Sequence, residues 1–217
     1  MKLFGTYEYN EDFANAIAES LNAAYSDKAS SHNYHIVYSH ILDGKTVNNF
    51  LEIGLFLNEL QHTDLNAWAS IYPSANIYGA DIKREQLFDS GNIKTFYADQ
   101  SDVASLEALK AEIDVEFDVI VDDASHMYGS TISAFNSLFP AVKSGGVYII
   151  EDVLDNGEGG NGWQQKLTDI ETFLVDGGYT YEVFQALEPS KVIDQETGEP
   201  TDVDAASDSY IVCVYKN

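Results

Sequence analysis

Two short segments bring together side chains of the kinds that bind cations and accept protons. Residues 117–126 read Phe-Asp-Val-Ile-Val-Asp-Asp-Ala-Ser-His, and residues 145–152 read Gly-Gly-Val-Tyr-Ile-Ile-Glu-Asp. Each segment is an apolar run, typical of a buried strand, that ends in two carboxylates. The first segment adds His126 three residues after its second aspartate.

These carboxylates are expected to meet at one edge of a parallel sheet, where neighbouring strands lie about 4.8 Å apart. Four carboxylates at that spacing repel one another and would take up protons unless a cation lay among them. Carboxylate oxygens are hard ligands that favour Mg²⁺, Ca²⁺ or Mn²⁺ over zinc. The pattern therefore predicts a metal site beside a general base, because an imidazole exchanges protons readily near neutral pH.

The elements that would position these residues alternate between strand and helix patterns after about residue 46. Apolar runs that we interpret as strands occupy residues 50–53, 76–80, 93–97, 117–121 and 147–150. Between them, apolar residues recur at helical spacing in residues 64–72, 102–112, 128–139 and 163–175. Strands that alternate with helices form parallel βαβ units, so the sequence predicts an α/β fold with a doubly wound sheet.

The two ends of the chain depart from this alternation. Residues 179–186 and 210–215 are strand-like with no helical pattern between them, which predicts a closing antiparallel pair. Residues 11–25 and 34–42 have helical patterns and would form a cap before the sheet. We therefore expect one domain over residues 1–217, with the helical cap at 1–46 and the core at 47–217.

Two connections are long and polar, and their sequences leave two interpretations open. Residues 154–162 are rich in glycine, and residues 187–208 are acidic and contain two prolines and a glycine. Each is either a lid over the site or a disordered loop. Trp163, at the end of the first connection, would stack on a sugar ring or anchor the next helix.

The charge of the chain restricts the kinds of partner that it can bind. The 36 acidic and 11 basic residues give a formal charge of -25, and no cluster of basic residues relieves it. This field repels nucleic acid and anionic membranes, so we expect neither as a partner. No apolar run approaches membrane length, and the single cysteine, Cys213, excludes an internal disulfide, so we expect a soluble cytoplasmic protein.

Polar residues also follow the earlier strands, at the edge where doubly wound sheets bind ligands. An acid after the second strand can accept hydrogen bonds from ribose hydroxyls, and one after the third can accept from an adenine amino group. The ordered set favours a nucleoside-containing cofactor over a series of unrelated helix caps. The set consists of Glu52 and Gly54, then Asp81, then Asp99 and Gln100, then Asp122 and Asp123.

With Glu-x-Gly followed by acids after the next three strands, the chain resembles the class I S-adenosylmethionine-dependent methyltransferases. In more detail it is similar to the metal-dependent macrolide-sugar O-methyltransferases of the mycinamicin and tylosin type. This closer resemblance depends on residues 26–34, 77–81, 121–126, 135–140 and 149–152. It implies a mostly parallel, seven-stranded Rossmann-like sheet with an antiparallel last strand and an N-terminal helical cap.

The resemblance also implies a role for each site residue. The metal ligands would be Asp123, Glu151 and Asp152, holding Mg²⁺ or another hard divalent cation, and His126 would be the catalytic base. The cofactor, S-adenosylmethionine, would be bound by Glu52, Gly54, Asp81, Asp99, Gln100 and Asp122. Asp122 would face the methionine end of the cofactor. His32 and Tyr34 would either close over the cofactor or acceptor, or pack within the cap.

The function implied is Mg²⁺-dependent O-methyl transfer to a hydroxyl of a sugar, a glycan or a glycosylated small molecule. A catechol-like diol is an alternative acceptor, and a non-catalytic binding protein that kept the fold is an alternative of another class. Phe56, where the family has a second glycine, favours the binding protein, whereas the intact acids and His126 argue against it. A nicotinamide-dependent dehydrogenase is disfavoured because Gly-x-Gly-x-x-Gly is absent. The acceptor's identity and any homo-oligomer are left open.

Overall fold

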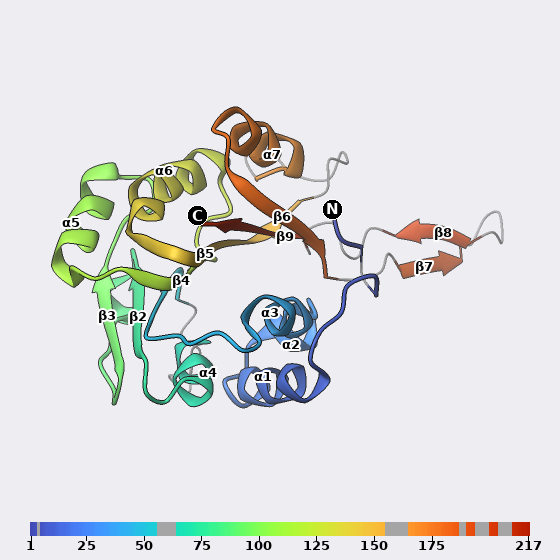
Figure 1. Cartoon of the computed structure of the whole chain (residues 1–217), viewed down its shortest axis with the longest axis horizontal. Coiled ribbons are helices and arrows are strands. Elements are labelled where there is room, and N and C mark those ends of the chain that lie inside the picture. The colour runs from blue at the N-terminus through green and yellow to red at the C-terminus, as the bar shows by residue number, and fades with distance from the viewer. Residues whose placement is uncertain (4, 56–63, 155–164, 187–189, 194–199, 204–209) are drawn as a thin grey trace.

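The structure, a computed structural model, describes residues 1–3, 5–55, 64–154, 165–186, 190–193, 200–203 and 210–217. Its centre is a seven-stranded sheet with the order β3-β2-β1-β4-β5-β9-β6 (Figure 1). The strands are β1 (Asn49–Ile53), β2 (Asn76–Asp81), β3 (Ile93–Tyr97), β4 (Phe117–Asp122), β5 (Val142–Val153), β6 (Thr180–Gln185) and β9 (Tyr210–Tyr215). Strands β1 to β5 are parallel, and β9 runs antiparallel to both of its neighbours. The predicted doubly wound sheet with an antiparallel last strand is confirmed.

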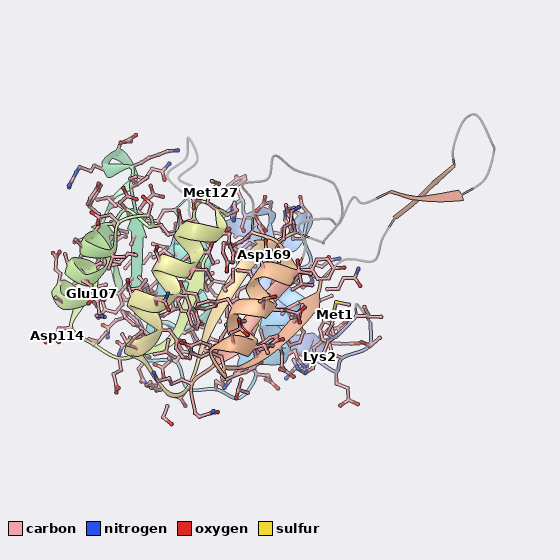
Figure 2. All side chains as sticks on the ribbon, turned by 90° about the horizontal axis from the view of Figure 1, so that it is seen from above. Met1, Lys2, Glu107, Asp114, Met127 and Asp169 are labelled. Atoms are coloured by element: carbon pink, nitrogen blue, oxygen red, sulfur yellow. The ribbon has the colours of Figure 1, made fainter. Side chains whose placement is uncertain are left out.

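Helices cover both faces of the sheet (Figure 1). One face carries α1 (Glu11–Ala23), α2 (Asp27–Ser30), α3 (Tyr34–Leu42) and α4 (Asp64–Ile71). The other face, toward the viewer in Figure 2, carries α5 (Val103–Ile113), α6 (Tyr128–Leu138) and α7 (Leu167–Asp176). Two short 3₁₀ helices, η1 (Arg84–Gln86) and η2 (Phe139–Ala141), lie in connections. The N-terminal cap predicted from the helical patterns is thus a layer of helices against the sheet.

The covering of both faces explains the continuous apolar runs in the sequence. Every residue of β4 is buried, and from Val119 to Val121 its side chains alternate between two hydrophobic clusters. Val119 and Val121 belong to the cluster beneath α1, α3 and α4, whereas Ile120 belongs to the cluster beneath α5, α6 and α7. The side chain of a polar residue at the end of such a strand therefore points toward one layer of helices or the other, depending on its place in this alternation.

Strand β5 continues beyond its predicted end at residue 150. It runs to Val153, so Glu151 and Asp152 lie within the strand and not after it. The pairing of β5 with β9 shifts register between Ile150 and Val153, and Asp152 has a left-handed backbone with φ of 52°. This irregularity is a β-bulge, a feature that re-aims side chains at the rims of sheets.

The connection at 187–208 contains secondary structure that the sequence analysis did not predict. Strands β7 (Ser190–Ile193) and β8 (Pro200–Val203) pair antiparallel as a separate two-stranded sheet that extends from the body of the molecule (Figures 1 and 2). The β-branched residues of these segments suit such pairing. The other residues of that connection, residues 155–162, Phe56 and Trp163 lie outside the described residues.

Two further expectations concern membrane-spanning segments and the single cysteine. No helix among the described residues combines the length and the apolar character needed to cross a lipid bilayer. Cys213 is fully buried in β9 with its thiol free.

Asp118 in β4 anchors the beginning of β1. Its Oδ2 accepts hydrogen bonds from the backbone N–H groups of Asn48, at 2.7 Å, and Asn49, at 2.9 Å. Its Oδ1 forms an ion pair with Lys143, and only 6% of the Asp118 side chain is exposed. The start of the strand that carries Glu52 toward the site is therefore held by one buried carboxylate.

We expect Asp118→Ala to lower the free energy of unfolding by about 1–3 kcal/mol, because it leaves two backbone N–H groups without their acceptor. Asp118→Asn keeps an acceptor oxygen and should lose less. Urea unfolding followed by circular dichroism measures the free energy of unfolding of both variants. Equal stability of Asp118→Ala and the wild type would show that these hydrogen bonds do not stabilise the fold.

Candidate active site

A cavity of about 730 Å³ lies at the carboxyl edge of the sheet. This volume is within the range of about 300–1,000 Å³ that small-molecule sites occupy. Segments that follow β1, β2, β3 and β4 line it, together with Asp152 in β5 and the segment between α1 and α2. The predicted site residues that line it are Gly54, Asp81, Asp99, Gln100, Asp123, His126 and Asp152. Glu52, Asp122 and Glu151 are buried outside the lining.

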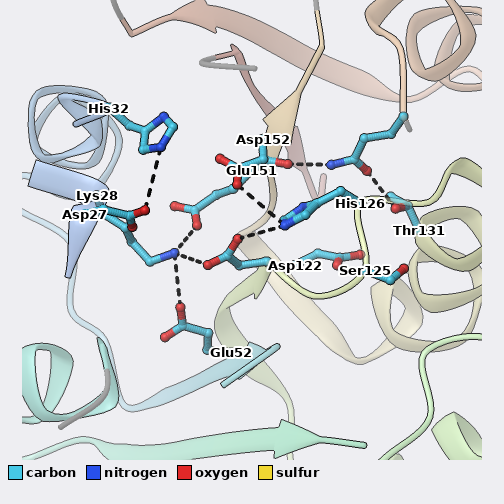
Figure 3. A network of polar contacts seen from close by, with 12 residues as sticks. Asp27, Lys28, His32, Glu52, Asp122, Ser125, His126, Thr131, Glu151 and Asp152 are labelled. Carbon is cyan, nitrogen blue, oxygen red and sulfur yellow. Dashed lines mark hydrogen bonds and ion pairs between the residues drawn. The ribbon is translucent and has the colours of Figure 1, made fainter. Parts of the chain in front are cut away.

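Three residues at the cavity face one another as candidate metal ligands or proton carriers. The Nε2 atom of His126 lies 3.8 Å from Oδ1 of Asp123 and 3.5 Å from Oδ2 of Asp152. One donor atom from each of the three lies within 4.8 Å of the others. The second oxygen of Asp152 accepts a hydrogen bond from the hydroxyl of Tyr34 on α3, at 2.6 Å. The acids predicted from two strand ends are thus brought together around one imidazole (Figure 3).

A buried lysine lies in the middle of the carboxylates, and sequence reasoning missed it. The Nζ atom of Lys28, on α2, bonds to Asp123 and Glu151 and lies 3.4 Å from Oε1 of Glu52 and 3.3 Å from Oδ2 of Asp64. Figure 3 shows Lys28 between Glu52 and Glu151. Only 2% of the Lys28 side chain is exposed.

Burial alone would lower the pKa of Lys28, but the negative charges of Asp123 and Glu151 outweigh it and raise this pKa well above its usual value. The signal in the sequence was present, since Lys28 lies inside the 26–34 segment and is one of few basic residues. A lysine on a four-residue helix nevertheless reads as a surface residue until the fold shows what covers it.

Glu52 and Glu151 point toward the layer of α1 to α4 and not into the cavity. Glu52 pairs with Val121 across β1 and β4, and Val121 pairs with Ile149 across β4 and β5. The side chains of Glu52, Val121 and Ile149 therefore lie on one face of the sheet. Glu52 accepts a hydrogen bond from Nε1 of Trp68 at 3.0 Å, and Glu151 accepts one from the hydroxyl of Tyr38 at 2.6 Å.

Burial is the main influence on the charge of both acids. It raises the pKa of Glu52 to about 8 and the pKa of Glu151 well above its usual value. Glu52 and Glu151 are 1% and 0% exposed, and both form ion pairs with the ammonium of Lys28.

Asp122 points to the opposite face and supports the loop that carries Asp123 and His126. Its two oxygens accept hydrogen bonds from Nε2 of Gln100, at 2.5 Å, and from the hydroxyl of Tyr148, at 3.0 Å. Burial raises the pKa of Asp122 to about 8. The other end of the Gln100 amide accepts from the backbone N–H of Ser125 at 3.1 Å. Asp122 is therefore placed beneath the cavity, linked to the loop through Gln100.

The remaining predicted residues shape the other half of the cavity. Gly54 has φ of 95°, and a Cβ at this position would lie 2.1 Å from the backbone oxygen of Asp123, so only glycine fits. Asp81 accepts from the backbone N–H groups of Leu55 and Lys83, each at 2.7 Å. Asp99 accepts from the N–H of Ser101 at 2.9 Å. Each carboxylate oxygen has further lone pairs, so both acids can still accept from a ligand.

Comparison with known proteins places the chain near sugar O-methyltransferases. No family model matches it. It is 39% identical over 89 residues, 41% of its length, to the 8-demethyl-8-(2-methoxy-alpha-L-rhamnosyl)-tetracenomycin-C 3'-O-methyltransferase of Streptomyces olivaceus. It is 37% identical over 89 residues, again 41% of its length, to the mycinamicin VI 2''-O-methyltransferase of Micromonospora griseorubida. These matches cover 23% and 22% of the relatives, so the chain matches about a quarter of their length. The resemblance inferred from the motifs is confirmed.

Comparison of structures shows the fold. The MycE methyltransferase from the mycinamycin biosynthetic pathway, solved in complex with Mg and SAH, aligns with a TM-score of 0.65 at 23% identity. The alignment covers 93% of this chain and 55% of that one. The chain therefore has the Rossmann-like fold of these methyltransferases, as the sequence analysis predicted.

The buried charge network makes a direct prediction for Lys28. We expect Lys28→Met, which keeps the length of the side chain, to lower the free energy of unfolding by about 3–5 kcal/mol, because buried carboxylates lose their cation. These acids then gain most from holding protons in the folded state, so the loss should be smaller at pH 6 than at pH 9.

Denaturant unfolding at both pH values checks the Lys28 prediction. Lys94→Met is the matched control, since Lys94 is exposed on β3 and its replacement should change stability by less than about 0.5 kcal/mol. An effect of Lys28→Met no larger than that of the control would contradict the network.

Proposed function

We propose that this chain carries an S-adenosylmethionine-dependent, Mg²⁺-dependent O-methyltransferase site for a hydroxyl of a sugar or glycosylated small molecule. The observation that carries the proposal is the cluster of Asp123, His126 and Asp152 on the wall of a cofactor-sized cavity. The names of the sequence relatives favour a sugar hydroxyl over a catechol-like diol, because one is named for a rhamnosyl-bearing tetracenomycin and the other for mycinamicin VI.

The donor set fits a hard divalent cation. Asp123 and Asp152 each direct one oxygen toward the same region, beside the cavity, and acidic oxygens are the ligands that Mg²⁺ prefers. Glu151 completes the proposed ligand set, and its binding requires it to exchange its contact with Lys28 for the ion. When bound there, Mg²⁺ would supply Lewis acidity that lowers the pKa of a coordinated acceptor hydroxyl.

Residues of the chain itself would remove the proton from the acceptor hydroxyl. His126 accepts the proton of the acceptor hydroxyl at Nε2, the nitrogen that faces the two carboxylates. The negative charges of Asp123 and Asp152 stabilise the imidazolium that forms. When bound, S-adenosylmethionine would supply an electrophilic methyl group for the acceptor oxygen, and its sulfonium sulfur would become a neutral thioether.

The cofactor would lie along the other half of the cavity. We propose that Asp81 accepts from the ribose hydroxyls and Asp99 from the adenine amino group, with Gly54 allowing the close approach of the backbone. Glu52 and Asp122 would act on the cofactor site indirectly, because they are buried behind it. Glu52 would act through Lys28, and Asp122 would act through Gln100.

The role of His126 predicts a clear separation of binding from turnover. His126→Ala should lower the rate of methyl transfer by about 10²–10⁴-fold, the usual contribution of a general base, while S-adenosylmethionine still binds. Transfer of a labelled methyl group to a panel of rhamnosides measures the rate, and calorimetry measures the binding. Unchanged turnover in this variant would refute the role of His126.

The metal proposal predicts that Asp123→Asn lowers the affinity for Mg²⁺ by at least about tenfold, because it removes one charged ligand. Calorimetry with Mg²⁺ alone measures this affinity. In parallel, excess chelator should abolish turnover of the wild type, and added Mg²⁺ should restore it. A wild type that is equally active in chelator would end the metal assignment.

A further inference from the structure

Two residues of the proposed site have backbones that ordinary side chains seldom adopt. His126 and Asp152 both have φ of 52°, in the left-handed region. Such a conformation in a residue other than glycine costs about 1–3 kcal/mol and persists only where the surroundings hold it. The two residues belong to different segments, so other parts of the structure must hold both backbones in this conformation.

Gln165 bonds to both of these segments. Its backbone N–H donates to the backbone oxygen of His126 at 2.9 Å. Its side-chain Nε2 donates to the backbone oxygen of Glu151, the residue before Asp152, at 2.5 Å. Its own backbone oxygen accepts from the N–H of Leu154, at 3.0 Å, at the end of the same stretch of chain. One residue therefore ties the loop after β4 to the bulge of β5.

The orientation of the Gln165 amide is set by a second buried residue. The hydroxyl of Thr131 on α6 donates to Oε1 of Gln165 at 2.7 Å, and Figure 3 shows Thr131 at the edge of the polar network around His126 and Glu151. Both side chains are 1% exposed. Because the amide oxygen is occupied by Thr131, the amide nitrogen is the group that faces Glu151.

We propose that Gln165 is a positioning residue that holds the backbones carrying His126 and Asp152 in register with each other. It would thereby set the 3.5 Å separation between the imidazole and the carboxylate. The inference rests on the proposed function, and it assigns Gln165 no contact with cofactor or acceptor.

The chemistry at this position requires both ends of an amide. A glutamate would direct a carboxylate oxygen at the backbone oxygen of Glu151, and the two would repel each other. A methionine has the same length with neither a strong donor nor a strong acceptor. The buried backbone oxygen and the Thr131 hydroxyl would then each lose a partner.

The test compares Gln165→Met and Thr131→Val with Thr172→Val. The control removes a hydroxyl that donates to a backbone oxygen, that of Thr168 at 2.7 Å, on the exposed side of α7. We expect Gln165→Met to lower kcat by about 10–100-fold, as loss of a supporting hydrogen bond around a metal site does, and to weaken Mg²⁺ binding measured by calorimetry. The KM for S-adenosylmethionine should stay within about threefold of the wild type.

Thr131→Val should change kcat in the same direction by less, and Thr131→Ser, which keeps the hydroxyl, should lie closer to the wild type. If Gln165→Met fails to fold, Thr131→Val decides by the same measurements. Wild-type kcat, pH profile and Mg²⁺ affinity in the folded variants would overturn the inference, even if their melting temperatures fall.

A readout independent of activity separates the inference from the proposed function. The ring resonances of His126, identified by their loss in His126→Ala, should shift in Gln165→Met and not in Thr172→Val. If the wild type neither transfers methyl groups nor binds Mg²⁺, the proposed function fails. In that case, displaced His126 resonances in Gln165→Met would still support the positioning role, and unchanged resonances would overturn it.

Discussion

The ammonium of Lys28, buried among carboxylates, is the interaction on which the rest of the site depends. Asp123 and Glu151 bond to it directly, and Glu52 and Asp64 lie within 3.4 Å of it. Burial and mutual repulsion both disfavour the charge of these acids, and the ammonium of Lys28 opposes that effect, so its loss would favour their protonated forms still further or push them apart. The charge of Lys28 therefore allows strands that end in acids to lie side by side in one sheet.

The alternation of side chains along the strands divides these acids into two sets. Glu52 and Glu151 face the layer of α1 to α4, where Lys28, Trp68 and Tyr38 contact them. Asp122 faces the layer of α5 to α7 and supports the cavity floor through Gln100. Of the predicted acids that line the cavity, Asp81 ends β2, Asp99 and Asp123 follow β3 and β4, and Asp152 lies in the bulge of β5, where the alternation is broken. Residues that line the cavity and residues buried behind it are thus neighbours in the chain, as Asp122 and Asp123 are.

The two halves of the cavity are built differently. On one side, Asp81 at the end of β2 and Asp99 after β3 accept hydrogen bonds from backbone N–H groups and keep lone pairs that could accept from a ligand. On the other, an imidazole lies between two carboxylates on a backbone held in an uncommon conformation. The formal charge of -25 is compatible with a neutral glycosylated acceptor and unfavourable to a polyanion.

The sequence by itself determined the fold class, the order of helices and strands apart from α2, β7 and β8, and the meeting of Asp123, His126 and Asp152. Apolar runs that end in acids are local features, and the rule that parallel strands end at one edge converts them into proximity. Only the tertiary structure decided that Glu52, Asp122 and Glu151 lie behind the cavity wall, since a one-residue difference in register or a bulge changes the face that a side chain occupies. It also decided the burial of Lys28 and the bonds of Gln165, residues that reach the site from segments far away in the chain. Such contacts depend on how layers pack against the sheet, and no local spacing encodes them.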